Sequence, residues 1–412
     1  LGGAVYRTPG REHTPAVIMI LLDEMVKRRK ALLSLLPKAS AFVLPGYRMQ
    51  YSSQNIFYRF KQNNNVIYFT GLKEPGDAVV ISYDHKWHLF RQPDTPESVL
   101  WEGAKTPDDV IKQNHLIDHV HDLQTLSGFI DDLPNDVKLY LNQSQNDCVR
   151  FEADDRTLSV DPFIHRLRVI KSEYEIEQME QSCQIAGNVF NTLRKKLRGM
   201  ETERHVENYL EAAVKTQGAE GLAYVPVVAG GPRACTIHYT RNDQKLMGNE
   251  LLLVDAGCVY NDYCSDITRT LQVGKLMTAA QEKVTEAVKT IQQTVLDWLA
   301  QNWKHHTLLD LQSVAYHQTV RELKGLGVDP KHVDTLFPHA IGHYLGMDLH
   351  DCPTVGMSAK LKPGMIITIE PGLYFTDSLD YPEEYRGIGV RVEDDVLITE
   401  SGPRVLTENA EV

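Results

Sequence analysis

The sequence predicts an α/β protein of the mixed, α+β kind, built from two domains. Its 412 residues are 42% hydrophobic and 24% charged, which is typical of globular proteins, and the length is sufficient for two domains. Strand-like runs alternate with amphipathic helical segments in both parts of the chain. We expect an N-terminal domain over residues 1–165 and a C-terminal domain over 166–412.

Charge and hydropathy exclude several classes of partner. A formal net charge of −12 argues against nucleic acid or an anionic membrane. The longest apolar runs, such as 17–22, are far too short to cross a bilayer, so no transmembrane segment is predicted. The six cysteines form no CxxC pair, which predicts free thiols in a reducing compartment. Because the chain begins with Leu1, we expect a processed or trimmed N-terminus whose targeting segment is not visible.

The N-terminal domain begins with a polar, turn-prone arm, 1–16, followed by a helix expected over about 17–36. Runs rich in β-branched and aromatic residues predict strands at 41–44, 56–58, 66–69, 78–81, 87–90 and 138–141. A second helix near 107–115 completes a mixed α/β domain. We identify no catalytic constellation in it.

The C-terminal domain opens with a capping box, in which Ser172 is followed three residues later by Glu175. Apolar residues up to Leu197 then recur at helical spacing. Three more amphipathic helices are predicted, at about 202–217, 279–300 and 307–326. After the second helix, the extended segment 224–231 leads into a short strand, 235–239, that carries His238.

The stretch 251–273 predicts a β-hairpin with an aspartate inside each strand. If the turn is centred on Tyr260-Asn261, Asp255 faces Asp266, with Cβ atoms about 4.5–5.5 Å apart, and like charges at that distance repel. A shared proton or a divalent cation between the carboxylates would offset the repulsion. The hairpin alone does not choose between them.

The last seventy residues supply further candidate ligands. His339, His343 and His350 lie within twelve residues of one another. Two later strand-like runs contain Glu370 and Glu393, and a symmetric pairing about Tyr381-Pro382 sets these carboxylates opposite each other. Two acidic strand pairs, one in each half of the domain, predict a duplicated structural unit.

Four carboxylates and one imidazole form an oxygen-rich donor set that favours Mn²⁺, with Co²⁺, Fe²⁺ and Zn²⁺ as alternatives. Because two of the carboxylates can bridge, we expect a pair of divalent metal ions about 3.5–4 Å apart, as in two-metal hydrolases. Such a pair lowers the pKa of a bound water and polarises a carbonyl group.

These residues and the strings around them resemble the aminopeptidase P and prolidase family of pita-bread metallopeptidases. The strings are Val-Asp-Ala-Gly at 254–257, Ser-Asp-Ile-Thr-Arg-Thr at 265–270, Gly-His-Tyr-Leu-Gly at 342–346, Ile-Glu-Pro-Gly at 369–372 and Val-Arg-Val-Glu-Asp at 390–394. The N-terminal domain fits the family through Gln-Asn-Asn-Asn at 62–65 and Trp-Glu-Gly at 101–103. The resemblance covers nearly the whole chain and is closest to the mitochondrial branch of aminopeptidase P.

The resemblance implies an N-terminal aminopeptidase P-type domain, a C-terminal pita-bread catalytic domain and a five-residue metal site. Asp266 and Glu393 would bridge two metals, Asp255 would chelate one of them, and His343 with Glu370 would complete the other. One departure is Tyr-Val-Pro at 224–226, where the family often has Tyr-Pro-Pro.

The resemblance also implies roles in catalysis. Glu370 would accept a proton from the attacking water, while His238 and His350 would hold the substrate carbonyl and the developing oxyanion. His339 would line the pocket. Arg391 and Tyr374 would support the metal ligands.

The function implied is removal of one N-terminal residue from a peptide or an imported protein, either before proline or as a mitochondrial processing step that removes a bulky residue. A prolidase-type dipeptidase and a non-catalytic pita-bread binding module are the alternatives. The resemblance further implies a mitochondrial location, with cytoplasm or nucleus as alternatives, and a homodimer or higher homo-oligomer.

Overall fold

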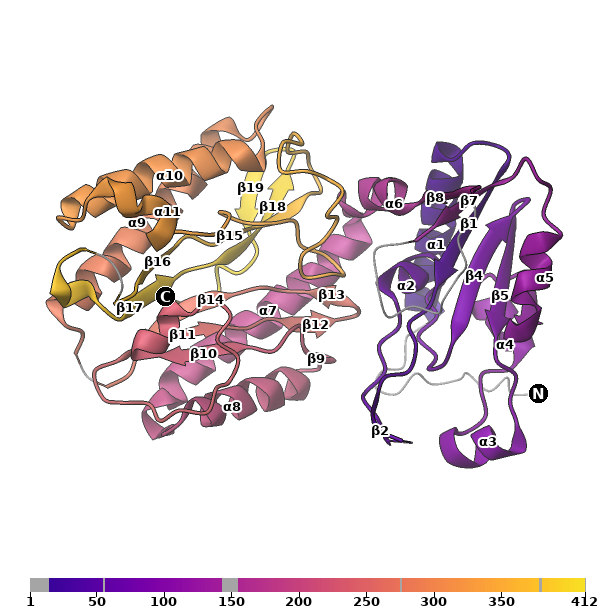
Figure 1. The fold of residues 1–412 in the computed structure, drawn as a ribbon, viewed down its shortest axis with the longest axis horizontal. Helices are drawn as coiled ribbons and strands as arrows, with labels where there is room; N and C mark the ends of the chain where they lie inside the picture. The colour runs from indigo at the N-terminus through magenta and orange to yellow at the C-terminus, as the bar shows by residue number, and fades with distance from the viewer. Residues whose placement is uncertain (1–14, 55, 143–154, 275, 378–379, 412) are drawn as a thin grey trace. The chain divides into compact units, whose positions relative to one another are not determined.

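The computed structural model describes residues 15–54, 56–142, 155–274, 276–377 and 380–411. The chain divides into two compact units, Leu1–Leu167 and Arg168–Val412, which are described in turn (Figure 1). Each unit contains hydrophobic clusters of its own. The polar arm expected at 1–16 lies almost entirely outside the described residues.

The N-terminal unit is built on a six-stranded mixed sheet (Figure 1). Its strands are β1 (Ser40–Pro45), β4 (Ala78–Tyr83), β5 (Lys86–Arg91), β6 (His119–Asp122), β7 (Lys138–Leu141) and β8 (Thr157–Ser159). The order is β6-β5-β4-β1-β7-β8, with antiparallel pairing in the middle and parallel pairing toward both edges. The strands predicted at 41–44, 78–81, 87–90 and 138–141 are confirmed.

Helices and a small hairpin complete this unit. The elements are α1 (Pro15–Leu35), α2 (Asn64–Thr70), α3 (Pro96–Glu102), α4 (Asp108–Asn114), α5 (Leu126–Asp131), α6 (Asp161–Arg168), β2 (Tyr51–Ser53) and β3 (Ile56–Phe57). The two predicted helices correspond to α1 and α4, and the strand predicted at 56–58 corresponds to β3.

The strand predicted at 66–69 is wrong, because these residues belong to α2. Asn63 caps this helix by accepting a hydrogen bond from the Asn65 amide, and Gly71 ends it in the left-handed conformation with φ 68°. Every residue of α2 is buried. A short helix that is buried on all sides carries no helical periodicity of apolar residues, so the composition of 66–69 alone favoured a strand.

The C-terminal unit consists of two halves, each with two long helices packed outside its strands (Figure 1). The first half contains α7 (Glu173–Lys196), α8 (Glu203–Thr216), β9 (Gly221–Leu222), β10 (Val227–Gly230), β11 (Leu251–Asp255), β12 (Cys258–Tyr260), β13 (Tyr263–Cys264) and β14 (Thr268–Gln272). The second half contains α9 (Ala279–Asn302), α10 (Leu308–Gly325), α11 (Val333–Leu336), β15 (Ile366–Ile369), β16 (Gly372–Phe375), β17 (Ile388–Arg391), β18 (Asp394–Thr399) and β19 (Gly402–Val405). The strands lie between the two helix pairs (Figure 1).

The four long helices of this unit begin at the predicted positions. The capping box of Ser172 and Glu175 is present, and Thr307 with Asp310 caps α10 in the same way. The apolar faces of α9 and α10 belong to one large hydrophobic cluster, and those of α7 and α8 belong to another. Each half of the sheet system is therefore held by its own pair of helices.

The hairpin of Asp255 and Asp266 has a different register from the one predicted. The turn is centred on Asn261-Asp262, whose φ angles of 46° and 73° are those of a two-residue type I′ turn. This shift pairs Asp255 with Thr268 and leaves Asp266 in the irregular stretch between β13 and β14. The two aspartates are not directly opposed in the ladder.

The pairing predicted for Glu370 and Glu393 is confirmed on both sides of these residues. β15 pairs with β18 so that Ile369 faces Asp394, and β16 pairs with β17 so that Gly372 faces Arg391. Both ladders keep the register that sets Glu370 against Glu393, and the two glutamates occupy the break between them.

His238 does not lie in a strand. The segment Gly231–Cys235 is a 3₁₀ helix, and a turn follows it, so the strand predicted at 235–239 is wrong. Five cysteines of the described chain are free thiols, Cys183, Cys235, Cys258, Cys264 and Cys352. Among the described residues, no helix is long and apolar enough to cross a membrane.

Candidate metal centre and active site

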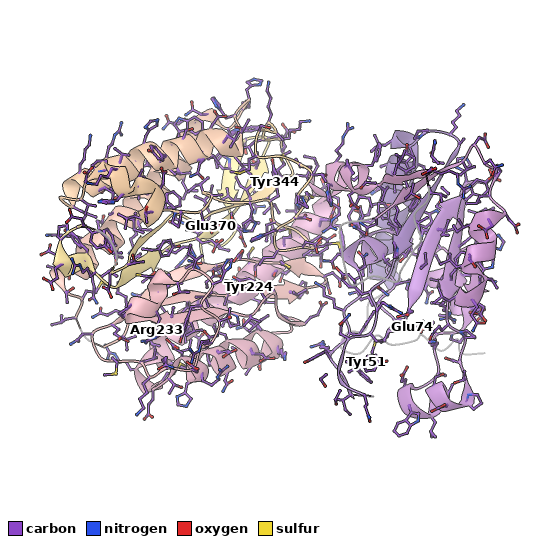
Figure 2. The ribbon with its side chains drawn as sticks, in the orientation of Figure 1. Tyr51, Glu74, Tyr224, Arg233, Tyr344 and Glu370 are labelled. Atoms are coloured by element: carbon purple, nitrogen blue, oxygen red, sulfur yellow. The ribbon has the colours of Figure 1, made fainter. Side chains whose placement is uncertain are left out.

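Asp255 ends β11 and Asp266 precedes β14, and a tyrosine joins their carboxyl groups. Tyr224, in the segment between β9 and β10, is labelled in Figure 2. Its hydroxyl lies 2.5 Å from Asp255 Oδ1 and 2.5 Å from Asp266 Oδ1. One hydroxyl proton cannot satisfy both oxygens at once. The shifted hairpin register therefore still brings the two carboxyl groups to one point.

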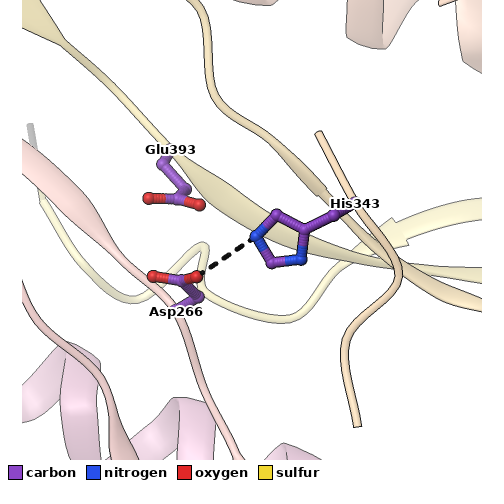
Figure 3. A group of neighbouring side chains, drawn as sticks. All are labelled: Asp266, His343 and Glu393. Atoms are coloured by element: carbon purple, nitrogen blue, oxygen red, sulfur yellow. Dashed lines mark ion pairs between the residues drawn. The ribbon is translucent and has the colours of Figure 1, made fainter. Parts of the chain in front are cut away.

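A histidine and a glutamate from the second half approach Asp266. Ligand atoms of Asp266, His343 and Glu393 all lie within 4.8 Å of one another (Figure 3). His343 Nε2 lies 3.5 Å from Asp266 Oδ2 and 3.6 Å from Glu370 Oε1. Asp255, Asp266, His343, Glu370 and Glu393 thus form one connected centre between the two halves of the C-terminal unit.

The orientation of His343 is set by its other ring nitrogen. Nδ1 donates to the Tyr344 carbonyl at 3.0 Å, which directs the Nε2 lone pair toward the carboxylates. Burial alone lowers the pKa of His343, but the bond to Asp266 and the charge of Glu370 outweigh it and raise the pKa to about 9. Facing two acceptors, Nε2 requires either a proton or a metal ion.

The carboxyl groups are ionised only at a cost. Burial, together with the charge of Asp266, raises the pKa of Asp255, raises that of Glu370 to about 7 and raises that of Glu393 well above its ordinary value. Arg391 opposes this shift at all three positions. The single positive charge of the Arg391 guanidinium does not neutralise the negative charge of four buried carboxylates.

Divalent cations fit this donor set. They supply the positive charge that the buried carboxylates lack, and the atoms available are carboxylate oxygens and one oriented imidazole nitrogen, which suit hard or borderline ions. Thr268 Oγ1 donates to Glu393 Oε2 at 2.7 Å and Thr368 Oγ1 to Glu370 Oε1 at 3.2 Å. These hydroxyls fix the carboxylates from outside, leaving other lone pairs for a metal.

A hydrogen-bonded chain leads away from Asp255. Arg391 Nη2 donates to Asp255 Oδ2 at 2.5 Å and Nη1 donates to the Tyr374 hydroxyl at 2.9 Å. Tyr374 lies 2.8 Å from His339 Nε2, whose Nδ1 lies 2.9 Å from the Ala340 carbonyl. Because burial lowers the pKa of His339 to about 4, the ring is neutral, so Nδ1 donates and Nε2 accepts from Tyr374.

Two candidates remain, His238 and His350. Both are exposed, and the His350 ring lies 4.2 Å from the His343 ring. A charge on His238 would lower the pKa of both His339 and His350. Apart from His238, the predicted site residues are therefore linked by direct contacts.

Sequence reasoning missed three supporting residues. Tyr224 entered it only as part of an atypical string, and Thr268 only within a motif. Arg269, 1% exposed, donates to the Glu393 carbonyl at 2.6 Å and to Asp394 Oδ1 at 2.6 Å. The alternation Thr268-Arg269-Thr270 inside an apolar strand was the available signal, since a buried arginine needs acidic or carbonyl partners.

A buried acidic centre with one oriented histidine, set between the two halves of the unit, is typical of a metal-dependent hydrolase. Residues 177–400 match the family described as Metallopeptidase family M24, and residues 25–140 match the N-terminal domain of aminopeptidase P. The chain belongs to metallopeptidase family M24, and its C-terminal unit has the pita-bread fold.

The similar proteins are aminopeptidases. Mitochondrial intermediate cleaving peptidase 55 of Arabidopsis thaliana is 33% identical over 94% of this chain and 80% of its own length. Xaa-Pro aminopeptidase 3 of Homo sapiens is 33% identical over 97% of this chain and 85% of its own. The crystal structure of Icp55 from Saccharomyces cerevisiae matches with a TM-score of 0.84 and 30% identity, covering 95% of this chain and 94% of that one. The protein is a metallo-aminopeptidase, a hydrolase that requires divalent metal ions.

Proposed function

We propose that the protein releases one N-terminal residue from peptides or imported proteins by metal-dependent hydrolysis at the centre of Asp255, Asp266, His343, Glu370 and Glu393. The observation that carries the proposal is the convergence of these five donors from both halves of the unit. When bound, a pair of divalent cations lowers the pKa of water and polarises the scissile carbonyl.

The protein's own groups do the rest of the chemistry. Glu370 accepts the proton from the attacking water, and its second oxygen lies 3.9 Å from His339 Nδ1. His238 and His350 donate hydrogen bonds to the substrate carbonyl and to the oxyanion that develops from it. Arg391 holds Asp255 and Tyr374 in place.

Two substrate classes fit this chemistry. Peptides with proline second correspond to relatives named Xaa-Pro aminopeptidase, and processing intermediates with a bulky first residue correspond to relatives named intermediate cleaving peptidase. We propose that processing is the physiological role and that it takes place in mitochondria.

Peptide profiling tests the proposal. Purified protein with added Mn²⁺ is given matched peptides that begin with Tyr, Leu or Arg and carry proline or another residue second. Release of Tyr or Leu from peptides without proline supports the processing role. Cleavage restricted to proline-second peptides overturns that role but leaves the aminopeptidase, whereas cleavage restricted to dipeptides favours a prolidase.

We propose Mn²⁺ as the native ion, because carboxylate oxygens dominate the donor set. Elemental analysis after purification without chelators gives the metal content. Reconstitution of the metal-free protein with Mn²⁺, Co²⁺ and Zn²⁺ ranks their activities. Highest activity with Zn²⁺, together with Zn²⁺ in the purified protein, contradicts this assignment.

We further propose a homo-oligomer formed through the N-terminal unit. Large apolar side chains are exposed on α3 and on the β2-β3 hairpin, Leu100 at 82%, Trp101 at 72%, Ile56 at 58% and Phe57 at 50%. Exposed apolar surface of this kind marks interaction sites. Light scattering tests the proposal, since L100D is expected to lower the molecular mass relative to wild type. A monomeric wild type contradicts it.

A further inference from the structure

The His238 side chain has few interactions of its own that would fix its position. The residue is exposed, and its ring forms no hydrogen bond or ion pair with any residue that the structure describes. It follows the 3₁₀ helix Gly231–Cys235, in a loop that runs from β10 to β11. The position of the ring is therefore set by whatever fixes this loop.

Glu203, the first residue of α8, lies beneath the loop and is 0% exposed. Its carboxylate receives four hydrogen bonds, all from residues on either side of His238 in the sequence. The donors are the Gly230 amide at 3.0 Å and Arg233 Nε at 2.7 Å on Oε1, and the Tyr239 hydroxyl at 2.8 Å and the Gln244 amide at 3.0 Å on Oε2.

Only a carboxylate satisfies this site. All four partners donate, and each oxygen of Glu203 accepts two hydrogen bonds, so the side chain must accept through both of its terminal atoms. A glutamine of the same shape would turn its amide N–H groups toward two of the donors, whichever way it is flipped. Each donor left unpaired in a buried place is costly.

We propose that Glu203 is the positioning residue for His238, holding the loop so that the imidazole reaches the substrate carbonyl. Tyr239 is the nearest link, because it follows His238 directly and donates to Glu203. The inference rests on the proposed role of His238. It assigns to a buried acid outside the metal centre a function in substrate binding.

A double-mutant cycle tests the inference in the full-length, metal-loaded protein. H238A is expected to lower kcat/KM about 10²-fold by removing one donor to the oxyanion. E203Q is expected to lower kcat/KM at least about tenfold in the wild type and to have little effect in the H238A background. A purely structural role would lower kcat/KM by the same factor in both backgrounds.

Two further variants distinguish a local effect on kcat/KM from a general loss of folded structure. Y239F removes a single donor to Glu203, keeps the ring, and is expected to lower kcat/KM severalfold with the same dependence on His238. T202A removes the N-cap of α8, where Thr202 accepts from the His205 amide, without touching the four bonds to Glu203. It is expected to lower the melting temperature and leave kcat/KM unchanged.

The outcomes separate the two proposals. If H238A retains wild-type kcat/KM, the role of His238 fails and the inference falls with it. If H238A is impaired but E203Q and Y239F lower kcat/KM equally in both backgrounds, or not at all, the role of His238 stands and that of Glu203 is overturned. Metal content, measured for every variant, must match that of the wild type.

Discussion

Glu370 lies between two histidines, with one oxygen 3.6 Å from His343 Nε2 and the other 3.9 Å from His339 Nδ1. We expect E370Q to lower kcat by about 10²–10⁴-fold, because an amide cannot take the proton of the attacking water. Its thermal stability without metal should not fall, since one buried acid is removed from a repulsive group. Metal analysis distinguishes loss of the ion from loss of proton transfer, and full activity in this variant would contradict the mechanism.

His88 gives the N-terminal unit a dependence of stability on pH. Burial lowers its pKa from 6.5 to about 4, and the charges of neighbouring histidines add to the effect. The neighbouring ionisable groups are Lys86 of β5, Asp118 just before β6, and His119 and His121 of β6. Because the folded protein disfavours the protonated ring, the stabilisation is complete above pH 6.5 and is lost as the pH falls toward 4.

The measurement is the melting temperature of the N-terminal unit between pH 7.5 and 4.5 for wild type and H88F. Phenylalanine fits beside Phe129, whose ring lies 4.8 Å from that of His88. H88F is expected to lose less stability over this range. Parallel curves for the two proteins would show that His88 does not contribute.

At the scale of elements, the turn residues explain where sequence reasoning succeeded and failed. Asn261 and Asp262 both adopt positive φ, which asparagine and aspartate tolerate, so the turn falls one residue later than a symmetric reading placed it. The sequence did not indicate helix α2, because a helix that is buried on every side lacks the helical periodicity of apolar residues. The long amphipathic helices were predicted well, because one apolar face and a capping box specify them locally.

A glycine beside His343 fixes the approach of two elements. A Cβ atom on Gly342 would lie 1.9 Å from the Thr368 carbonyl oxygen, a backbone atom of β15 that cannot turn aside. The adjacent Thr368 amide donates to the His343 carbonyl at 2.9 Å, so the same contact positions the imidazole. We expect G342A to cost about 2–4 kcal/mol in the free energy of unfolding and to lose metal affinity.

Gly248 provides the matched control. A Cβ atom there would meet nothing within 4 Å, so G248A should change the free energy of unfolding by less than about 0.5 kcal/mol. Chemical denaturation and metal titration of both variants check the comparison. Equal effects of the two substitutions would contradict the close-approach argument.

At the scale of the whole molecule, the site draws its residues from both halves of the C-terminal unit. Asp255 and Asp266 come from the first half, and His343, Glu370 and Glu393 come from the second, so neither half holds the centre alone. The sequence could indicate these residues because each acid interrupts an apolar run. It could not indicate Glu203, since its partners are backbone groups and side chains that only the tertiary fold brings together, and for Arg269 it indicated burial within a strand but not the partners.

Metal removal should act on one unit and not on the other. The proposed ligands belong only to the C-terminal unit, and without cations their carboxyl groups repel one another or take up protons. Binding at 100 times the dissociation constant contributes about 2.7 kcal/mol to the folded state. Chelation is therefore expected to speed amide hydrogen exchange in β11, β14, β15 and β18 and to leave the exchange in β1, β4 and β5 unchanged.

The variant D266N, which lacks one of the shared ligands, provides the control and should show a much smaller change in amide exchange on addition of chelator. Equal changes in both sheets, or none in either, would show that the centre does not hold the metal that stabilises this fold.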